Sequence, residues 1–487
     1  MSFSPLVQKL SNFSPRRASC FADKKSRHRG AENEAIFRRA AGEKAEAIAR
    51  VEAVARAGNG LVVDLSRHFN AIVEIDRGAR RVRVQPGVVR NELNLELAKQ
   101  GLFFGPETSM ANRAMIGGMV GNNSCGSSSI VYGSTREHLV SVRGFFSDGT
   151  EGILHALGVG EFQAKCADAP GVEGRVYRRV RDLLGEESNR RLITDNFPRA
   201  SIPRRNTGYA LDLLMDASAL DPASGRDFNF CRLIAGSEGT LFFGLEFELD
   251  CDSLPPHAAL VCGHFRSVNE ALRANLIAVE HAPSAGELID RHILECTKSN
   301  LAQQRNRDFV VGDPGAILVA ELRRDDAHFL AEVIASLQTR WKAVGYGYAV
   351  PVLRGEESAK VWELRRAGQG LMSNVVGDAK PREVVEDTAV DVRDLPDYIA
   401  EFNALLLENT VSVVSTMRMQ GPGSCIRGRF STSRPRRGSR PSAASRPTSR
   451  IWSKNTGGPC AREPRVCNWL NLDCSLGPDA AGLMFRR

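Results

Sequence analysis

Several features are missing from this sequence, and each absence excludes a class of protein. No apolar run reaches about 18 residues, the length that crosses a bilayer as a helix, so no membrane span is predicted. The 11 cysteines include no C-x-x-C pair, which argues against a zinc site, an iron–sulfur cluster or a thioredoxin-like motif. Neither G-x-G-x-x-G nor a Walker loop is present, so the sequence does not predict a Rossmann or P-loop nucleotide site.

The N-terminal residues and the cysteines bear on the location of the protein. Residues 1–30 are basic and serine-rich, but they lack the apolar stretch and small-residue cleavage site of a secretory signal. A transit peptide is a weaker alternative. Scattered cysteines in odd number are typical of reduced thiols in a cytoplasm. We therefore expect a cytoplasmic protein, with peripheral association with the inner membrane left open.

Acidic residues are absent between Asn409 and Arg462. Within this region, Ile426–Arg450 is crowded with Arg, Ser and Pro, and the tail accounts for the net charge of +8 and the pI near 9.0. No apolar spacing typical of a strand or a helix is sustained beyond Ser412, so we place a boundary there. A basic segment of this kind ordinarily indicates binding to nucleic acid or an anionic membrane.

Upstream of that boundary the chain is ordinary globular sequence. With 487 residues, 42% of them hydrophobic and 25% charged, it can bury two cores. Asn59–Asp76 and Arg80–Val89 are β-branched runs closed by turn residues, and Arg90–Gly101 has helical spacing. Asp227–Asp250 is rich in strand-forming residues, and amphipathic helices and strands follow to about residue 410. The pattern predicts two domains of mixed helix and strand.

One block, Met115–His138, holds five glycines and five serines. A flexible linker could have this composition. The block also carries apolar residues such as Met119, Val120 and Ile130, which a linker does not need, and it lies between strand-like runs. Glycine lets the backbone approach a ligand closely, and successive amide groups form a concavity suited to a pyrophosphate. We therefore favour a ligand cradle over a linker or a merely well-packed turn.

An ordered set of motifs resembles the FAD-linked oxidases of the vanillyl-alcohol oxidase type, and within them the bacterial D-2-hydroxyglutarate and D-lactate dehydrogenases. These motifs are VQPGVV, GLFFGPETSMANRAMIGGMVGNNSCGSSSIVYGSTREH, RRNTGYALDLL, GSEGTL, ELIDRHIL, VWELRRAG and GDAKPREVVEDTAVDVRDLPDYIAEF. The resemblance covers roughly Asn59 to Leu406.

The resemblance implies an α+β fold in two domains. We expect a two-subdomain FAD-binding domain at residues 59–250 and a substrate-binding cap with an antiparallel sheet at residues 251–410. Residues 1–58 are expected to be an unmatched segment with a degraded flavin loop, because Arg39–Gly42 is all that remains of the Gly-Thr-Ser loop of the family. Residues 411–487 are expected to be a basic, disordered tail.

Residues that line the flavin in the family can be carried over to matching positions. They are Pro106, Glu107, Thr108, Gly117, Gly118, Gly121, Asn122, Asn123, Gly126, Tyr132, Gly133 and Thr135, followed by Gly236, Glu238, Gly239 and Thr240 in a second turn. Without the resemblance, a simple strand-ending turn is the preferred interpretation of the second group.

The resemblance also implies a substrate and a reaction. A small D-2-hydroxy acid, 2-hydroxyglutarate or lactate-like, loses hydride to the flavin while a base removes the hydroxyl proton. Arg365 matches the arginine that grips the substrate carboxylate, and Lys380 matches a second cation. Arg205 and Asn206 are expected near the site. Alternatively, Arg365 is a solvated helix charge, and Arg205 and Asn206 make structural contacts only.

The chain departs from the family near its C-terminus. No histidine follows His328, so the histidines expected to complete the catalytic centre are absent, and no catalytic residue or metal ligand is assigned. The iron–sulfur cluster and divalent metal of intact relatives are not predicted here. Codons that permit the family's Gly-Glu-Leu-His motif in another frame suggest that Thr416–Gly438 is translated out of frame.

Three hypotheses about function follow. The first is a working FAD-dependent dehydrogenase that passes electrons to an unidentified acceptor. The second is a degenerate, truncated fragment without activity. The third is a protein whose basic tail binds nucleic acid, but out-of-frame reading explains the tail without any specific nucleic-acid partner.

Overall fold

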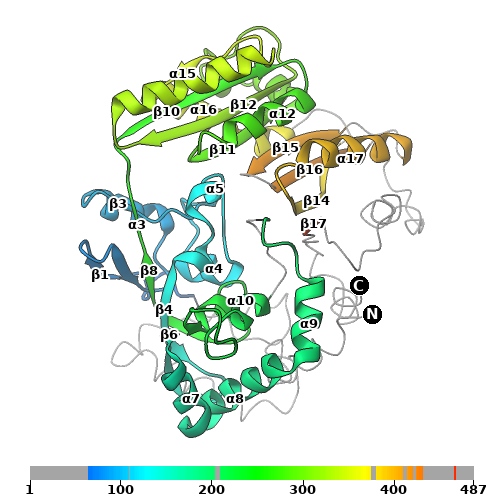
Figure 1. Ribbon diagram of the computed structural model, residues 1–487. Helices are drawn as coiled ribbons and strands as arrows, with labels where there is room; N and C mark the ends of the chain where they lie inside the picture. The colour runs from blue at the N-terminus through cyan, green and yellow to red at the C-terminus, as the bar shows by residue number, and fades with distance from the viewer. Residues whose placement is uncertain are drawn as a thin grey trace, which may run out of the picture.

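The computed structural model describes residues 64–108, 110–202, 209–373, 380–409, 414–420, 424–431 and 466–467. Within these ranges the chain forms a first domain, at the lower left of Figure 1, and a second domain with long strands and helices above it. The two are joined where the chain runs from strand β8 through β9 into β10.

A five-stranded antiparallel sheet, in the order β1-β2-β8-β4-β5, is the framework of the first domain. Its strands are β1 (Ile72–Asp76), β2 (Arg81–Val84), β4 (Leu139–Phe145), β5 (Glu151–Leu154) and β8 (Phe243–Asp250). Helix α3 (Arg90–Ala98) follows β2, as the sequence predicts. Two short pairs complete the strands: β3 (Leu102–Phe103) with β9 (Asp252–Ser253), and β6 (Ala156–Leu157) with β7 (Phe228–Asn229).

Helices pack against this sheet around one apolar core. They are α4 (Ile116–Asn122), α5 (Ser129–Tyr132), α6 (Thr135–His138), α7 (Val159–Asp168), α8 (Gly171–Gly185), α9 (Glu187–Asn196), α10 (Leu211–Met215) and α11 (Cys231–Ile234). The buried residues of α4 and of α7 to α11 share the core with the sheet; Ile116 of α4 and Val84 of β2 are both fully buried there. This packing fixes α4 relative to the sheet.

The second domain has a four-stranded antiparallel sheet in the order β11-β12-β10-β13, which confirms the antiparallel sheet expected for a cap. The strands are β10 (His257–Phe265), β11 (Ala285–Asp290), β12 (Ala316–Arg324) and β13 (Val352–Leu353). The helices are α12 (Val268–Val279), α13 (Arg291–Lys298), α14 (Leu301–Gln304), α15 (Ala327–Ala343), α16 (Glu356–Ser373) and α17 (Leu395–Asn409).

Both faces of this sheet are buried. Val261 of β10 belongs to the apolar cluster that includes α12, α15 and α17, whereas its neighbour Leu260 belongs to the cluster that includes α13 and α16. Successive strand residues point to opposite faces, so one strand contributes to two cores. All six residues of β11 are therefore buried.

A further sheet has the strand order β15-β16-β14-β17. Its strands are β14 (Lys380–Val390), β15 (Val414–Gln420), β16 (Ser424–Ser431) and β17 (Val466–Cys467). Three of these strands lie beyond residue 411, where the sequence analysis expects a tail without regular structure. They form because β15 pairs with β16 while β16 and β17 pair with β14, and local periodicity does not reveal such long-range pairing. The other residues of the expected tail lie outside the described ranges.

Candidate functional site

The glycine-rich block folds into the three consecutive helices α4, α5 and α6. Helix α4 is capped at its C-terminus by Asn123, whose φ of 50° lies in the left-handed region. A Cβ atom on Gly117 would lie 2.6 Å from Cβ of Pro86, and one on Gly126 would lie 2.7 Å from the carbonyl carbon of Glu107. These glycines are therefore needed for close packing, and the flexible-linker interpretation is wrong.

The two stretches expected to line the flavin meet at the end of α4. The backbone N–H of Gly236 donates to the carbonyl oxygen of Val120 at 2.9 Å, and that of Glu238 donates to Gly121 at 2.8 Å. The turn can present these amides because Gly236, Glu238 and Gly239 all have positive φ, between 53° and 88°. Residues more than a hundred positions apart in the chain thus form one surface.

Glycines on this surface face open space. A Cβ atom on Gly118 or on Gly239 would meet no other atom within 4 Å, whereas one on Gly121 would lie 3.7 Å from the backbone N of Gly239. The open α-carbons give a flat group room to approach the backbone of both stretches. This is the feature of the described residues that fits a flavin.

The third expected stretch, Pro106–Thr108, is held beside α5. Arg90 of α3 donates from Nε to the carbonyl oxygen of Pro106 at 3.1 Å, and Ser127 donates its hydroxyl to Oε2 of Glu107 at 2.6 Å. Burial lowers the pKa of Arg90, partly offset by the charge of Glu107. Thr108 is half-buried, and its carbonyl oxygen accepts from the N–H of Ala111.

Several of the expected flavin residues have side chains that hold the loop itself. Oδ1 of Asn123 accepts from the hydroxyl of Ser134 and from the backbone N–H of Arg136, both at 2.8 Å. The buried Thr135 donates its hydroxyl to the carbonyl oxygen of Ser124. Asn122 also contacts the hydroxyl of Ser124, at 3.4 Å, and Gly133 ends α5 with a φ of 67°.

In the second turn, Thr240 shares a hydrogen bond of 2.8 Å with the hydroxyl of Tyr209.

Arg136 is a structural residue that the sequence analysis missed. Its guanidinium donates from Nε to the carbonyl oxygen of Arg232 at 2.8 Å and from Nη2 to that of Ala235 at 2.7 Å. Those carbonyls lie in and just after α11, immediately before Gly236. The buried Arg136 therefore joins the glycine block to the second turn, but its sequence context resembles that of an ordinary surface charge.

Arg365, the expected substrate-binding arginine, is not a solvated helix charge. Its Nε donates to Oε2 of Glu287 on β11 at 2.9 Å, and the exposed fractions of the two side chains are 13% and 3%. The N–H groups on Nη1 and Nη2 make no hydrogen bond to another described residue. Helix α5 of the first domain contacts β11, so this ion pair is carried by a strand that borders the glycine block.

The other expected substrate residues are Lys380, Arg205 and Asn206. Lys380 is the first residue of β14, a strand that contacts α16, the helix of Arg365; its side chain lies outside the described part. Arg205 and Asn206 lie outside the described residues altogether.

Tyr132 is the expected flavin residue that faces the second domain. Burial raises its pKa, and the charges that act on it include Arg323, Glu321 and Arg324 of β12 as well as Asp252. Helix α5, which carries Tyr132, also contacts β11. Tyr132 therefore lies near both β11 and β12. The glycine block and the second-domain sheet therefore share one boundary.

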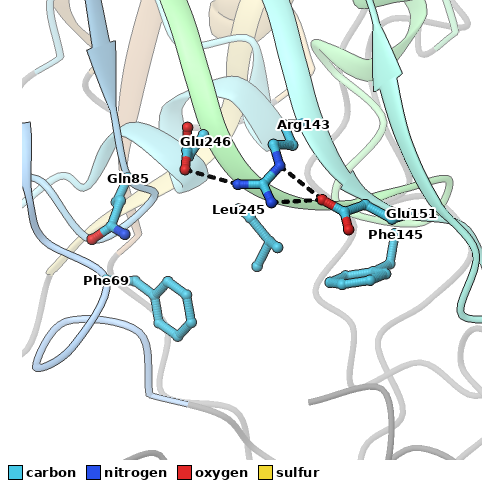
Figure 2. Close-up of a pocket in the computed structure, with 7 residues that line it drawn as sticks. All are labelled: Phe69, Gln85, Arg143, Phe145, Glu151, Leu245 and Glu246. Carbon is cyan, nitrogen blue, oxygen red and sulfur yellow. Dashed lines mark hydrogen bonds and ion pairs between the residues drawn. The ribbon is translucent and has the colours of Figure 1, made fainter. Parts of the chain in front are cut away.

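A separate pocket opens on the sheet of the first domain (Figure 2). Arg143 donates to Glu151 at 2.7 Å and to Glu246 at 3.1 Å across this pocket, with Phe69, Phe145 and Leu245 beside it. The charged groups satisfy one another, and none of the expected site residues lines the pocket. We do not assign a ligand to it.

Within the described part of the chain, no cluster of three or more His, Cys, Asp or Glu side chains is arranged to hold a metal ion. In the same part of the chain, every helix is too short or too polar to span a bilayer.

Comparison with known families agrees with this geometry. Residues 46–152 match the family described as FAD binding domain, and residues 254–423 match the C-terminal domain of FAD linked oxidases. The first match contains the glycine block and begins before Asn59; the second contains Glu287 and Arg365. The chain belongs to the FAD-linked oxidases.

Similar proteins include D-2-hydroxyglutarate dehydrogenases. That of Pseudomonas putida is 36% identical over 361 residues, covering 72% of this chain and 34% of the relative. That of Escherichia coli is 33% identical over 359 residues, covering 71% and 34%. The glycolate oxidase subunit GlcD of Bacillus subtilis is 34% identical over 357 residues, covering 73% and 60%. The chain thus spans about a third of the length of the two dehydrogenases.

Among solved structures, one of alkyldihydroxyacetonephosphate synthase aligns with a TM-score of 0.47 and 16% identity, covering 75% of this chain and 60% of the other.

Proposed function

We propose that this chain binds FAD on the glycine surface of α4 and the Gly236–Thr240 turn and oxidises a small D-2-hydroxy acid. The observation that carries the proposal is the pair of hydrogen bonds from Gly236 and Glu238 to the end of α4, which joins the two glycine stretches under an open face. Relatives named D-2-hydroxyglutarate dehydrogenase and glycolate oxidase subunit support the class of substrate.

Arg365 would hold the carboxylate of the acid. A guanidinium has five N–H donors, and Glu287 uses the one on Nε, so the edge formed by Nη1 and Nη2 can grip a carboxylate bidentately. Burial of the pair keeps the guanidinium in one orientation. Lys380 would add a second positive charge from the adjoining strand β14. We place Arg205 and Asn206 near the same site.

When bound, the flavin supplies the acceptor for the hydride that leaves the α-carbon. The residues of the chain orient the acid: Arg365 fixes the carboxylate, and Tyr132 closes the boundary between α5 and the second-domain sheet. We assign no base for the hydroxyl proton, because the histidines that the resemblance implies are absent after His328. The acceptor that takes electrons from the flavin is not assigned.

Arg365→Met tests the substrate site against a matched control. We expect the apparent affinity for D-2-hydroxyglutarate, followed as dye reduction by the FAD-loaded chain, to fall about a hundredfold, since two charge-assisted hydrogen bonds are lost. Arg366→Met removes the exposed neighbouring arginine. It should leave the affinity within about twofold of the original, because surface substitutions away from buried or substrate-binding groups have small effects. Equal losses in both variants would contradict the assignment of Arg365.

Two results would contradict the proposed function as a whole. If the chain binds FAD but no 2-hydroxy acid reduces the dye, the dehydrogenase proposal is wrong and the chain is a non-catalytic flavin-binding fragment. If the chain binds no FAD, the assignment of the glycine surface is wrong as well.

A further inference from the structure

His138 and Asp252 form a pair in the first domain that the proposed chemistry does not use. Nε2 of His138 lies 2.9 Å from Oδ2 of Asp252, and Nδ1 lies 3.2 Å from the carbonyl oxygen of Ser134. A carbonyl oxygen can only accept a hydrogen bond, so Nδ1 carries a proton. Nε2 must also carry one, because its lone pair would otherwise face the carboxylate. The geometry therefore favours the cationic imidazole.

The surroundings of the pair agree with this protonation state. Burial alone would lower the pKa of His138, but Asp252, the carbonyl of Ser134 and the charge of Glu137 raise it above the ordinary 6.5. Glu137 thus contributes a charge beside the pair, whereas Cys251 and Tyr132 stay neutral in this range: burial raises the pKa of Cys251 to about 12 and that of Tyr132 above 10. The charges of Arg323, Glu321 and Arg324 act on Tyr132, as that of Asp252 does.

Asp252 lies against the stretch that leads to the flavin residues. It pairs directly with Phe103 between β9 and β3, and a Cβ atom on Gly105 would lie 2.4 Å from Oδ2 of Asp252. The rings of Phe104 and His138 meet edge to face, with 5.5 Å between ring centroids. The pair therefore contacts three consecutive residues just before Pro106.

The glycine block holds the same stretch from another direction. Ser128 donates its hydroxyl to the carbonyl oxygen of Gly105 at 2.9 Å, and a Cβ atom on Gly105 would also lie 2.6 Å from Cβ of Tyr132. Gly105 is thus enclosed between α5 and the carboxylate of Asp252. Asp252 therefore bounds one side of Gly105, while Arg90 and Asn94 of α3 hold the carbonyl oxygens of its two chain neighbours.

We propose that His138 and Asp252 are a positioning pair, which fixes the Gly105–Thr108 stretch for FAD and joins it to the strand that leads into the second domain. The pair acts in its ionised form. Strand β9 carries Asp252, and β10 of the second domain begins only a few residues later, at His257. The inference rests on the proposed FAD site.

The test is the pH dependence of two properties of the full-length chain. The first is the dissociation constant of FAD, measured from flavin fluorescence, and the second is the unfolding temperature without FAD. Because the pKa of His138 is raised in the folded chain, the stabilisation is complete below pH 6.5 and is lost as pH rises through the raised pKa. FAD binding should weaken about tenfold across the same range, as a hydrogen bond between charged groups is lost.

His138→Gln keeps a donor toward Asp252 without the charge. We expect it to bind FAD about tenfold more weakly at low pH and to remove this pH dependence from both measurements. Asp252→Asn should do the same, and the double variant should be no worse than either single one, since the two groups act as a unit. His155→Gln removes a half-buried histidine of the same domain and should preserve the pH dependence.

Two results separate the failure of this inference from that of the proposed function. If the original chain binds FAD and His138→Gln retains its affinity and its pH profile, the pair is not a positioning device, although the FAD site stands. Additive losses in the double variant would overturn the pair in the same way. If the original chain binds no FAD at any pH, the FAD site is wrong and the positioning role fails with it.

Discussion

Neighbouring glycines in α4 have opposite surroundings. Gly117 faces Pro86 at a distance that leaves no room for a methyl group, whereas Gly118 faces open space. Sequence alone marks both as glycines of one motif and cannot distinguish them, because the difference depends on which side of the helix packs on the turn after β2. One residue is required by the fold, and the other is required only if a ligand lies over it.

Substituting these two glycines in turn tests that distinction. Gly117→Ala should lower the free energy of unfolding by about 1–3 kcal/mol because the added methyl group overpacks against Pro86. Gly118→Ala should leave it unchanged or raise it by up to about 1 kcal/mol, since alanine favours a helix. Urea unfolding without FAD measures both. Gly118→Ala should nevertheless weaken FAD binding at least about tenfold, and unchanged FAD affinity would contradict the flavin position.

Between elements, Arg136 links α6 to the end of α11 through two carbonyl oxygens. Arg136→Gln leaves these buried groups without their charged donor, so we expect a loss of about 2–4 kcal/mol in the free energy of unfolding. Arg143→Gln removes an arginine that is 46% exposed and paired on the sheet surface, and should cost at most about 1 kcal/mol. Urea unfolding of both variants tests the link; equal losses would show that Arg136 has no special role.

Local pattern predicted the elements that depend on local sequence. The strand expected within Arg80–Val89 forms as β2 (Arg81–Val84), and the helix expected at Arg90–Gly101 forms as α3 (Arg90–Ala98), because β-branched sequence and helical spacing there match the burial of these elements. Asp227–Asp250 was expected to be strand-rich, but Cys231–Ile234 forms helix α11 between β7 and β8. Four apolar-rich residues carry no distinguishing period, so packing decides their conformation.

The site was predictable only in part, for the same reason. Resemblance indicated the glycine stretches and Arg365, but not the partners that hold them. Glu287 lies in a fully buried strand, whose sequence is typical of a structural core. Asp252 is more than a hundred residues from His138 in the sequence. Such pairs depend on the tertiary fold, which single-sequence periodicity does not contain.

At the scale of the whole molecule, the boundary between the two domains is the feature on which the proposed function depends. The glycine surface and Tyr132 come from the first domain, while Glu287 lies on β11 of the second, which contacts α5, and is paired with Arg365 of α16. The proposed function places a substrate held by Arg365 and a flavin over Gly118 at this boundary. The chain spans about a third of the length of its dehydrogenase relatives. The test of the proposed function therefore addresses residues that this chain contains, at this boundary.

The most direct test is anaerobic mixing of the FAD-loaded chain with D-2-hydroxyglutarate, with the L-enantiomer as control. The account predicts that the absorbance of the oxidised flavin disappears with the D-acid and persists with the L-acid, and that Arg365→Met slows the loss about a hundredfold. A bound flavin that stays oxidised in the presence of the D-acid, or is reduced equally by both enantiomers, would contradict the claim that this boundary is a D-2-hydroxy acid site.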